Sequence, residues 1–158
     1  MNIRRERVEK FAVLGKLGST ADGKGFIQQL WKEANEKFNE VKPYAKKDKE
    51  GRYIGFWGLM SDFSLDFKPW KDYKEGYYLA GVEVKLDAPE AEGWTKWVYP
   101  GSDFVVVKVD HEYQEVMAEG LDYIKENGLH QNGAIFDFMN PKENGQLYLF
   151  FPVLEQEV

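Results

Sequence analysis

Apolar and polar residues follow two different periods along the chain, and these periods predict strands and helices. Residues 8–18, 53–60 and 77–86 carry the short runs of apolar, β-branched and aromatic residues that are typical of strands. Between the first two runs, apolar residues recur at spacings of three and four over residues 26–41, which predicts an amphipathic helix ended by Pro43. The first half of the chain is therefore predicted to run strand, helix, strand, strand.

The second half of the chain is predicted to repeat this order. An acidic connector at 87–93 separates the halves, and residues 113–124 carry a second helical stripe. Strands are predicted over residues 97–109, 134–139 and 146–153. An Asn-Gly pair joins the last two strands, and this pair is a strong hairpin signal.

This repetition predicts an α+β fold made of a duplicated β-α-β-β unit. The two pseudo-repeats cover about 8–86 and 97–153 of a single domain, 1–158. Two helices that are apolar on one side are most simply buried on the same face of one antiparallel sheet. We then expect a ligand cleft on the other face, where the repeats meet. Two unrelated α+β halves remain the alternative.

The composition is that of a globular protein with an unusual share of aromatic residues, 16%, from 11 Phe, 9 Tyr and 5 Trp. Such side chains fill a core and leave rings for a ligand site. The chain has 27 acidic and 21 basic residues, a net charge of −6, which disfavours direct contact with nucleic acid. It has no cysteine, which excludes disulfides, thiolate catalysis and Cys-ligated zinc.

Motifs of the common enzyme classes are missing. His111 and His130 are the only histidines, and Glu115 stands where an HExxH motif needs its second zinc ligand. Because there is no nucleophile elbow, Walker A loop or dinucleotide fingerprint either, we expect neither a metal nor a cofactor. No apolar run is long enough to span a membrane, and the basic N-terminus does not lead into a signal-peptide pattern, so we expect a cytoplasmic protein without a membrane partner.

Acids within apolar strands are the strongest chemical signal in the sequence. Asp137 interrupts the apolar strand at 134–139, and Glu83 lies within the strand at 77–86. A carboxylate among aromatic rings either takes up a proton or binds a cationic or hydrogen-bonding guest. If the repeats superimpose, Trp57 and Asp137 are predicted to face the same cleft. For both acids, a solvent-facing strand position is the alternative.

Aromatic side chains are expected beside these acids. Gly55 and Gly58 flank Trp57, and glycine in a strand allows a ligand or another backbone to approach closely. The rings of Trp57, Trp70 and Trp97 are expected to stack on a bound molecule, and their faces attract cations.

Six segments together resemble the GyrI-like (gyrase-inhibitor-like) family, the effector-binding domain also found at the end of AraC- and MerR-type regulators. They are FAVLG at 11–15, QLW at 29–31, GFWGL at 55–59, YLAGVEV at 78–84, VYPG at 98–101 and YLFFPV at 148–153. The resemblance spans about 8–153 and implies a duplicated β-α-β-β fold. It also implies a cleft that holds aromatic, often cationic, drug-like molecules against a buried glutamate.

The resemblance implies roles for specific residues of this chain. The glutamate of the family's Phe-Glu-x-Tyr pattern falls on Asp137, and Met139 replaces the tyrosine. The shorter acid sits farther from a guest, which weakens the expected preference for cations. The resemblance also implies that Tyr148 and Phe150 of the last strand line the cleft.

Two functions follow from these residues and this resemblance. The first is a stand-alone protein that binds an aromatic, amphipathic or cationic small molecule, as in drug or toxin sequestration, with Asp137 or Glu83 fixing its polar end. The alternative is a hydrolase that opens cyclopropanoid DNA-alkylating natural products with one of these carboxylates as general base. No helix-turn-helix pattern precedes residue 8, so we do not expect the chain to bind DNA itself. Binding to a protein partner is a third class, for which the sequence offers no interface pattern.

Overall fold

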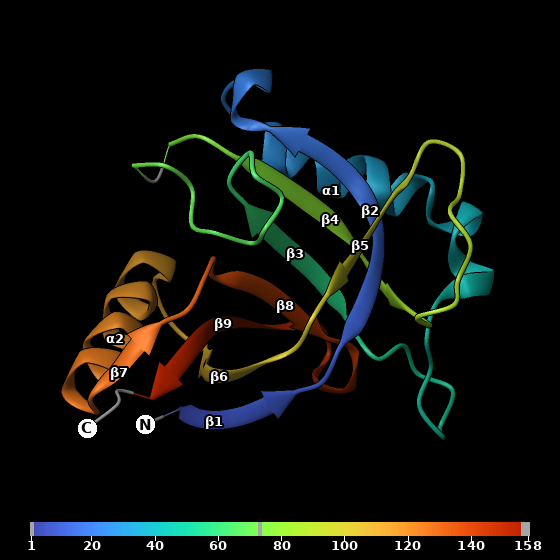
Figure 1. The fold of residues 1–158 in the computed structure, drawn as a ribbon. Coiled ribbons are helices and arrows are strands. Elements are labelled where there is room, and N and C mark those ends of the chain that lie inside the picture. The colour runs from blue at the N-terminus through green and yellow to red at the C-terminus, as the bar shows by residue number, and fades with distance from the viewer. Residues whose placement is uncertain (1, 73, 156–158) are drawn as a thin grey trace.

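The computed structural model describes residues 2–72 and 74–155, and nine strands and two α-helices lie in this part of the chain (Figure 1). The strands are β1 (Ile3–Val8), β2 (Phe11–Ser19), β3 (Phe56–Ser61), β4 (Tyr77–Val84), β5 (Thr95–Tyr99), β6 (Ser102–Lys108), β7 (Leu129–Gln131), β8 (Phe136–Asn140) and β9 (Gln146–Glu155). The helices are α1 (Phe26–Glu36) and α2 (Tyr113–Glu126), with four 3-10 helices η1 (Thr20–Asp22), η2 (Phe38–Glu40), η3 (Lys42–Tyr44) and η4 (Pro141–Glu143).

The sheet is built from two copies of one unit. Its strand order is β1-β6-β9-β8-β3-β4-β2-β5, with β7 also paired to β9, and every pairing is antiparallel. Outward from the central pair of β3 and β8, the order is β3-β4-β2 on one side and β8-β9-β6 on the other. Each half thus repeats strand, helix, strand, strand about a pseudo-twofold axis, which confirms the predicted α+β fold and its duplication.

The outermost strands cross between the halves. β1 runs directly into β2 but pairs with β6, and β5 runs directly into β6 but pairs with β2. The break between β5 and β6 falls at Pro100-Gly101, where Gly101 has a φ of +99°, a conformation that glycine adopts without strain. The exchange ties each half to the other. The sequence did not predict β1, because its only apolar residues, Ile3 and Val8, are separated by four charged residues and show no alternation.

Helix α1 is shorter than its apolar stripe predicted. It ends at Glu36, and the chain continues through η2 and η3. Phe38 and Val41 nevertheless pack into the same cluster as Ala34 of the helix. The stripe therefore predicted correctly which side chains are buried, although Phe38 and Val41 lie beyond the end of the α-helix. The short strand β7 was also not predicted.

Both helices cover the same face of the sheet, as expected. Under α1 lie Ala12, Leu14, Val82 and Val84. Under α2 lie Val105, Val107, Leu149 and Phe151. Figure 1 shows the two helices well apart, with the middle strands β3 and β8 between them.

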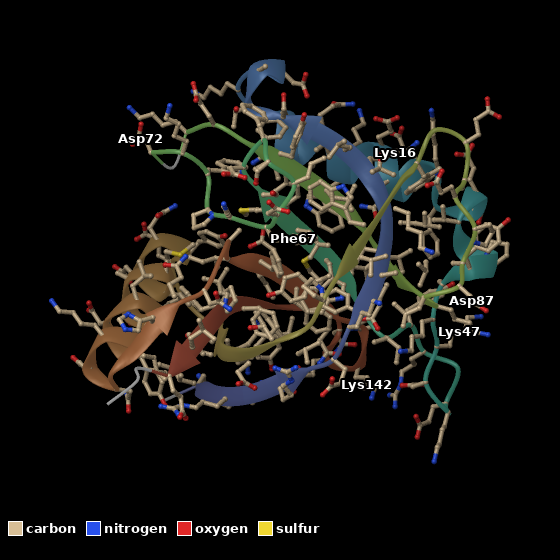
Figure 2. All side chains as sticks on the ribbon, viewed as in Figure 1. Lys16, Lys47, Phe67, Asp72, Asp87 and Lys142 are labelled. Atoms are coloured by element: carbon tan, nitrogen blue, oxygen red, sulfur yellow. The ribbon has the colours of Figure 1, made fainter. Side chains whose placement is uncertain are left out.

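The opposite face of the sheet holds an aromatic core. It draws side chains from both halves: Phe11, Trp57, Tyr99, Phe104, Phe136, Tyr148 and Phe150. Phe67, in the connection between β3 and β4, lies in the middle of the molecule (Figure 2) and packs edge-on against Trp97, Tyr99 and Phe136. The sequence predicts the ligand cleft on this face. Buried aromatic rings from both halves fill this face instead.

Candidate functional site

Asp137 lies on the helix-bearing face of the sheet, near its pseudo-twofold axis. Strand β8 pairs it directly with Gly58 of β3. Its side chain is partly buried and accepts two hydrogen bonds from phenols, one at each carboxylate oxygen. Tyr78 donates to Oδ2 and Tyr113 donates to Oδ1, both at 2.8 Å. This carboxylate is the chemical centre of the candidate site.

The two phenols bring elements of both halves together at Asp137. Tyr78 comes from β4 of the first half, and Tyr113 is the first residue of α2 in the second half. The indole of Trp31, on α1, donates to the Tyr78 hydroxyl at 3.1 Å and meets the Tyr78 ring edge-on. We call Trp31, Tyr78, Tyr113 and Asp137 the tyrosine–aspartate network. It links the two helices across the middle of the sheet.

The glycine at position 58 makes room for this network. A Cβ built at Gly58 would overlap the hydroxyl of Tyr78 and would touch Asp137. Gly55 likewise leaves room for a side chain on the opposite face, because a Cβ at this position would overlap the ring of Phe138. The sequence predicted a close approach at these glycines, and the approaching groups are side chains of the protein itself.

Burial sets the ionisation of the network. Burial raises the pKa of Asp137, although the hydrogen bonds from Tyr113 and Tyr78 act in the opposite direction. Burial also raises the pKa of Tyr78 and of Tyr113, and the neighbouring Asp137 charge raises both further. The phenols therefore stay protonated and act as donors, while Asp137 is the group that can carry charge.

An apolar pocket of about 390 Å³ opens beside the network, between α2 and the connection from β3 to β4. Its lining includes Met60, Pro69, Trp70, Met117, Leu121 and Ile135. Met60 pairs across the sheet with Tyr78, and Ile135 lies two residues before Asp137. A larger hollow of about 520 Å³ lies beside Lys42, Lys47 and Lys85 and contains none of the predicted site residues.

Trp70 is the predicted aromatic residue that lies at this pocket. Its indole donates to the carbonyl of Tyr77 at 3.0 Å, and its ring stacks on Phe26 of α1 at 6.3 Å between centroids. These two contacts hold the ring as a fixed wall of the pocket. The structure thus brings Asp137 and Trp70 to the same side of the sheet.

Trp57 and Asp137 do not share a cleft, contrary to our prediction. The register pairs Trp57 with Phe138 and Gly58 with Asp137, so Trp57 and Asp137 face opposite sides of the sheet. Trp57 is 3% exposed and stacks on Phe11, with centroids 4.6 Å apart. The proposed alignment of the repeats was offset by one residue, and in a strand one residue reverses the face.

Glu83 lies with Trp57 on the other face and is also buried, at 6% exposure. The Trp57 indole donates to its Oε1 at 3.0 Å, and the Lys46 ammonium lies 3.7 Å from its Oε2. Burial raises the pKa of Glu83, against the effect of these two partners. The solvent-facing alternative is therefore wrong for Glu83, and this acid is separated from Asp137 by the sheet.

The remaining predicted aromatic residues also belong to the opposite face. Phe150 lies 5.0 Å from Trp57 between centroids, and Trp97 packs edge-on against Phe67. Tyr148 is buried in the same cluster and donates its hydroxyl to Glu143. These side chains fill the aromatic core, and the structure does not bring them to Asp137.

The partners of Asp137 were missed by the sequence analysis. Tyr113 belongs to the helical stripe, Tyr78 to a predicted strand and Trp31 to the first stripe, so their pattern indicates core residues. Tyr78 and Tyr113 lie 59 and 24 residues from Asp137 in the chain. No local spacing rule links residues that far apart. The lone acid in an apolar strand was the one usable signal.

Neither metal-binding clusters nor membrane-spanning helices are found in the described part of the chain. Residues 2–72 and 74–155 contain no group of three or more His, Cys, Asp or Glu side chains arranged to hold a metal ion. None of the helices described there is long and apolar enough to cross a membrane.

The sequence matches no family model and no curated protein. Solved structures, however, share its fold. The C-terminal domain of EcmrR is 15% identical, with 98% of each chain covered and a TM-score of 0.64. The structure of SAV2435 bound to tetraphenylphosphonium is 15% identical, covers 98% of this chain and 94% of that one, and has a TM-score of 0.66.

A third solved structure, a hydrolase from Listeria innocua, is 13% identical, covers 97% of this chain and 92% of that one, and has a TM-score of 0.56. Identities this low show a shared fold. The resemblance to GyrI-like domains is thus confirmed at the level of the fold, and the chemistry has to be argued from the side chains.

Proposed function

We propose that this protein binds small molecules that combine an aromatic, apolar part with a polar or cationic end. One observation carries the proposal: a half-buried carboxylate, held by two phenols, lies two residues along the chain from Ile135, which lines an apolar pocket. Small-molecule sites have this composition, an apolar wall with a few fixed polar groups. Sequestration of a drug or toxin is the biological role that such a site serves.

Each part of the site has a separate task. Trp70, Met117 and Leu121 offer an apolar surface to the rings of a ligand, and its burial there drives binding. Asp137 attracts the polar or positive end, and the face of Trp70 adds cation–π attraction. SAV2435, which shares the fold, was solved with an aromatic cation, tetraphenylphosphonium, and this supports the same class of ligand for the present chain.

Binding of aromatic cations and their neutral analogues tests the proposal. We expect Asp137→Asn to weaken the binding of cations by about tenfold or more, since a hydrogen bond to a charged group contributes roughly 1.5–3 kcal/mol. Neutral analogues should lose less. Trp70→Ala should weaken both classes, because it removes an apolar wall. Affinities are measured by tryptophan fluorescence and calorimetry.

The matched control is Asp103→Asn, which removes the same charge from an exposed position on β6. It should leave every affinity unchanged. The proposal fails if no compound of the panel binds the wild-type protein, or if Asp137→Asn and Asp103→Asn behave alike.

The hydrolase alternative also centres on Asp137, because it is the partly exposed carboxylate whose pKa is raised by burial. Each of its oxygens has one phenol partner, and a carboxylate has further acceptor sites for a water molecule. Water would add across the strained carbon–carbon bond of a cyclopropane, its oxygen to one carbon and a proton to the other. Asp137 would take the proton from water and return it. Glu83 is on the other face and bonded to Trp57.

Mass analysis separates the two functions. If the protein only binds, a cyclopropane-bearing alkylator is converted no faster than in the protein-free control. A hydrolase converts it to the water adduct, and Asp137→Asn then binds the alkylator without turnover.

A further inference from the structure

Among the described residues, the carboxylate of Asp137 has two hydrogen-bond donors and no cationic partner. Each oxygen accepts one phenol hydrogen bond. None of the ion pairs formed by residues 2–72 and 74–155 involves Asp137. An ionised carboxylate has about four acceptor sites, so roughly half of its capacity is unused. Asp137 is half-buried, and the inference requires that a ligand reaches these sites from the exposed side of the residue.

The two phenols differ in how firmly they are held. Tyr78 is fully buried, receives the indole hydrogen bond of Trp31 and fits over Gly58. Tyr113 is partly exposed at the first turn of α2, and Asp137 is the hydrogen-bond partner found for its hydroxyl among the described side chains. Its oxygen still has acceptor capacity. Tyr78 is therefore a fixed part of the site, while Tyr113 is the phenol that is partly exposed to solvent.

We propose that the Asp137 site selects ligands that carry an N–H or O–H donor over equally charged ligands that carry none. The inference rests on the proposed function and ranks the ligands within it: primary, secondary and tertiary ammonium ions and neutral alcohols bind in preference to matched ligands without a donor, such as quaternary ammonium or phosphonium ions. Tyr113 is the positioning residue that sets this preference.

The physical reason is competition around the carboxylate oxygens. The two phenols occupy the space next to the oxygens and already stabilise part of the charge. A quaternary cation has no N–H or O–H donor. Its methyl groups keep its charge farther from the carboxylate oxygens than the phenol donors are, and the attraction is weaker at that distance. An N–H donor uses the remaining acceptor sites of Asp137 directly, and the Tyr113 oxygen offers a second acceptor beside them.

A matched pair of probes tests the inference with the whole protein. 1-Naphthylmethylamine and its N,N,N-trimethyl derivative have the same ring and the same charge at pH 7. We expect the amine to bind the wild-type protein about tenfold more tightly, the usual effect of one hydrogen bond to a charged group. Tyr113→Phe frees one oxygen of Asp137 and should shrink this ratio, mainly by strengthening the binding of the quaternary probe.

Tyr123→Phe is the control for this variant. Tyr123 lies on the same helix, packs into the cluster under α2 and takes no part in the network. It should leave the ratio of the two affinities as in the wild-type protein. A second pair, 1-naphthalenemethanol and its methyl ether, needs no variant: the alcohol should bind more tightly, although neither probe is charged.

The outcomes separate the two proposals. If the amine and the quaternary probe bind with equal affinity, the donor preference is overturned while the proposed small-molecule binding stands. If Tyr113→Phe leaves the wild-type ratio unchanged, the role of Tyr113 is overturned. If neither probe binds, and the wider panel of aromatic cations also fails to bind, the proposed function itself fails.

Discussion

Two carboxylates, Asp137 and Glu83, show how local surroundings give the same chemical group different roles. Both have a raised pKa because of burial. Asp137 is half-buried and has two phenol donors, with no cationic partner in the described part of the chain. Glu83 is less exposed to solvent and has the Trp57 indole and the Lys46 ammonium as partners. The arrangement at Asp137 leaves acceptor sites of the carboxylate for a ligand, whereas the arrangement at Glu83 fixes the position of Trp57 in the core.

The raised pKa of Glu83 predicts a pH-dependent cost to stability. Below its ordinary pKa, 4.5, Glu83 is protonated in both states, and its contribution to folding is fully present. As pH rises through the raised pKa that Glu83 has in the folded protein, that contribution is lost. The loss is about 1.4 kcal/mol for each pH unit between the pKa of Glu83 in the folded protein and its pKa in the unfolded protein. Glu83→Gln keeps an acceptor for Trp57 and has no such loss.

We therefore expect the free energy of unfolding of Glu83→Gln, relative to the wild-type protein, to increase between pH 4 and pH 8. Urea denaturation at several pH values measures it. Glu6→Gln, at an exposed position on β1, is the control and should show no trend. A difference between Glu83→Gln and wild type that stays constant with pH would contradict the prediction.

The glycine beneath Tyr78 gives a second prediction. Gly58→Ala should displace the Tyr78 hydroxyl and so weaken cation binding, besides destabilising the protein by about 1–3 kcal/mol through overpacking. Gly55→Ala is the matched control, because its Cβ would press on Phe138 of the other face instead. Both variants should lower the melting temperature, and ligand titration should show weakened binding for Gly58→Ala alone. Equal losses of affinity would contradict the role given to Gly58.

At the scale of elements, the register of β3 against β8 decides what each face presents. Three residue pairs connect these strands, and they place Trp57 with Phe138 and Gly58 with Asp137. Apart from Trp70, the aromatic residues of the predicted site therefore form the core on one face, while Asp137 lies on the face that bears the helices. The elements themselves were largely predicted, because their periods are local.

Trp57→Phe tests which face binds the ligand. Phenylalanine keeps most of the apolar contact but removes the N–H donor to Glu83, which should destabilise the protein by about 1–3 kcal/mol. Affinity for aromatic cations should stay at the wild-type value, since the ring lies across the sheet from Asp137. Denaturation and ligand titration of the same variant measure both effects. A loss of affinity comparable to that of Asp137→Asn would place the binding site on the aromatic face.

At the scale of the whole molecule, the exchange of β1 and β5 makes each half depend on the other. β1 completes the sheet beside β6, and β5 completes it beside β2. The tyrosine–aspartate network adds a polar link between the halves. We propose that the chain behaves as one domain for these reasons.

This proposal predicts one cooperative unfolding transition. All five tryptophans lie between residues 31 and 97, so their fluorescence reports mainly on the first half, while far-ultraviolet circular dichroism reports on both. The two signals should therefore change together in denaturant. A ligand at 100 times its dissociation constant should add about 2.7 kcal/mol to the whole transition. Separate transitions for the two signals would contradict the single domain.

The sequence by itself determined the repeated β-α-β-β order and the faces of both helices, and it singled out Asp137 as a candidate, because these depend on local periods and on one residue's chemistry. Three features were decided only by the tertiary structure: the exchange of the outer strands, the face on which Trp57 lies, and the phenols at Asp137. Each depends on the register between strands distant in sequence. A shift of one residue there reverses every side chain, and the packing of the two halves selects the register.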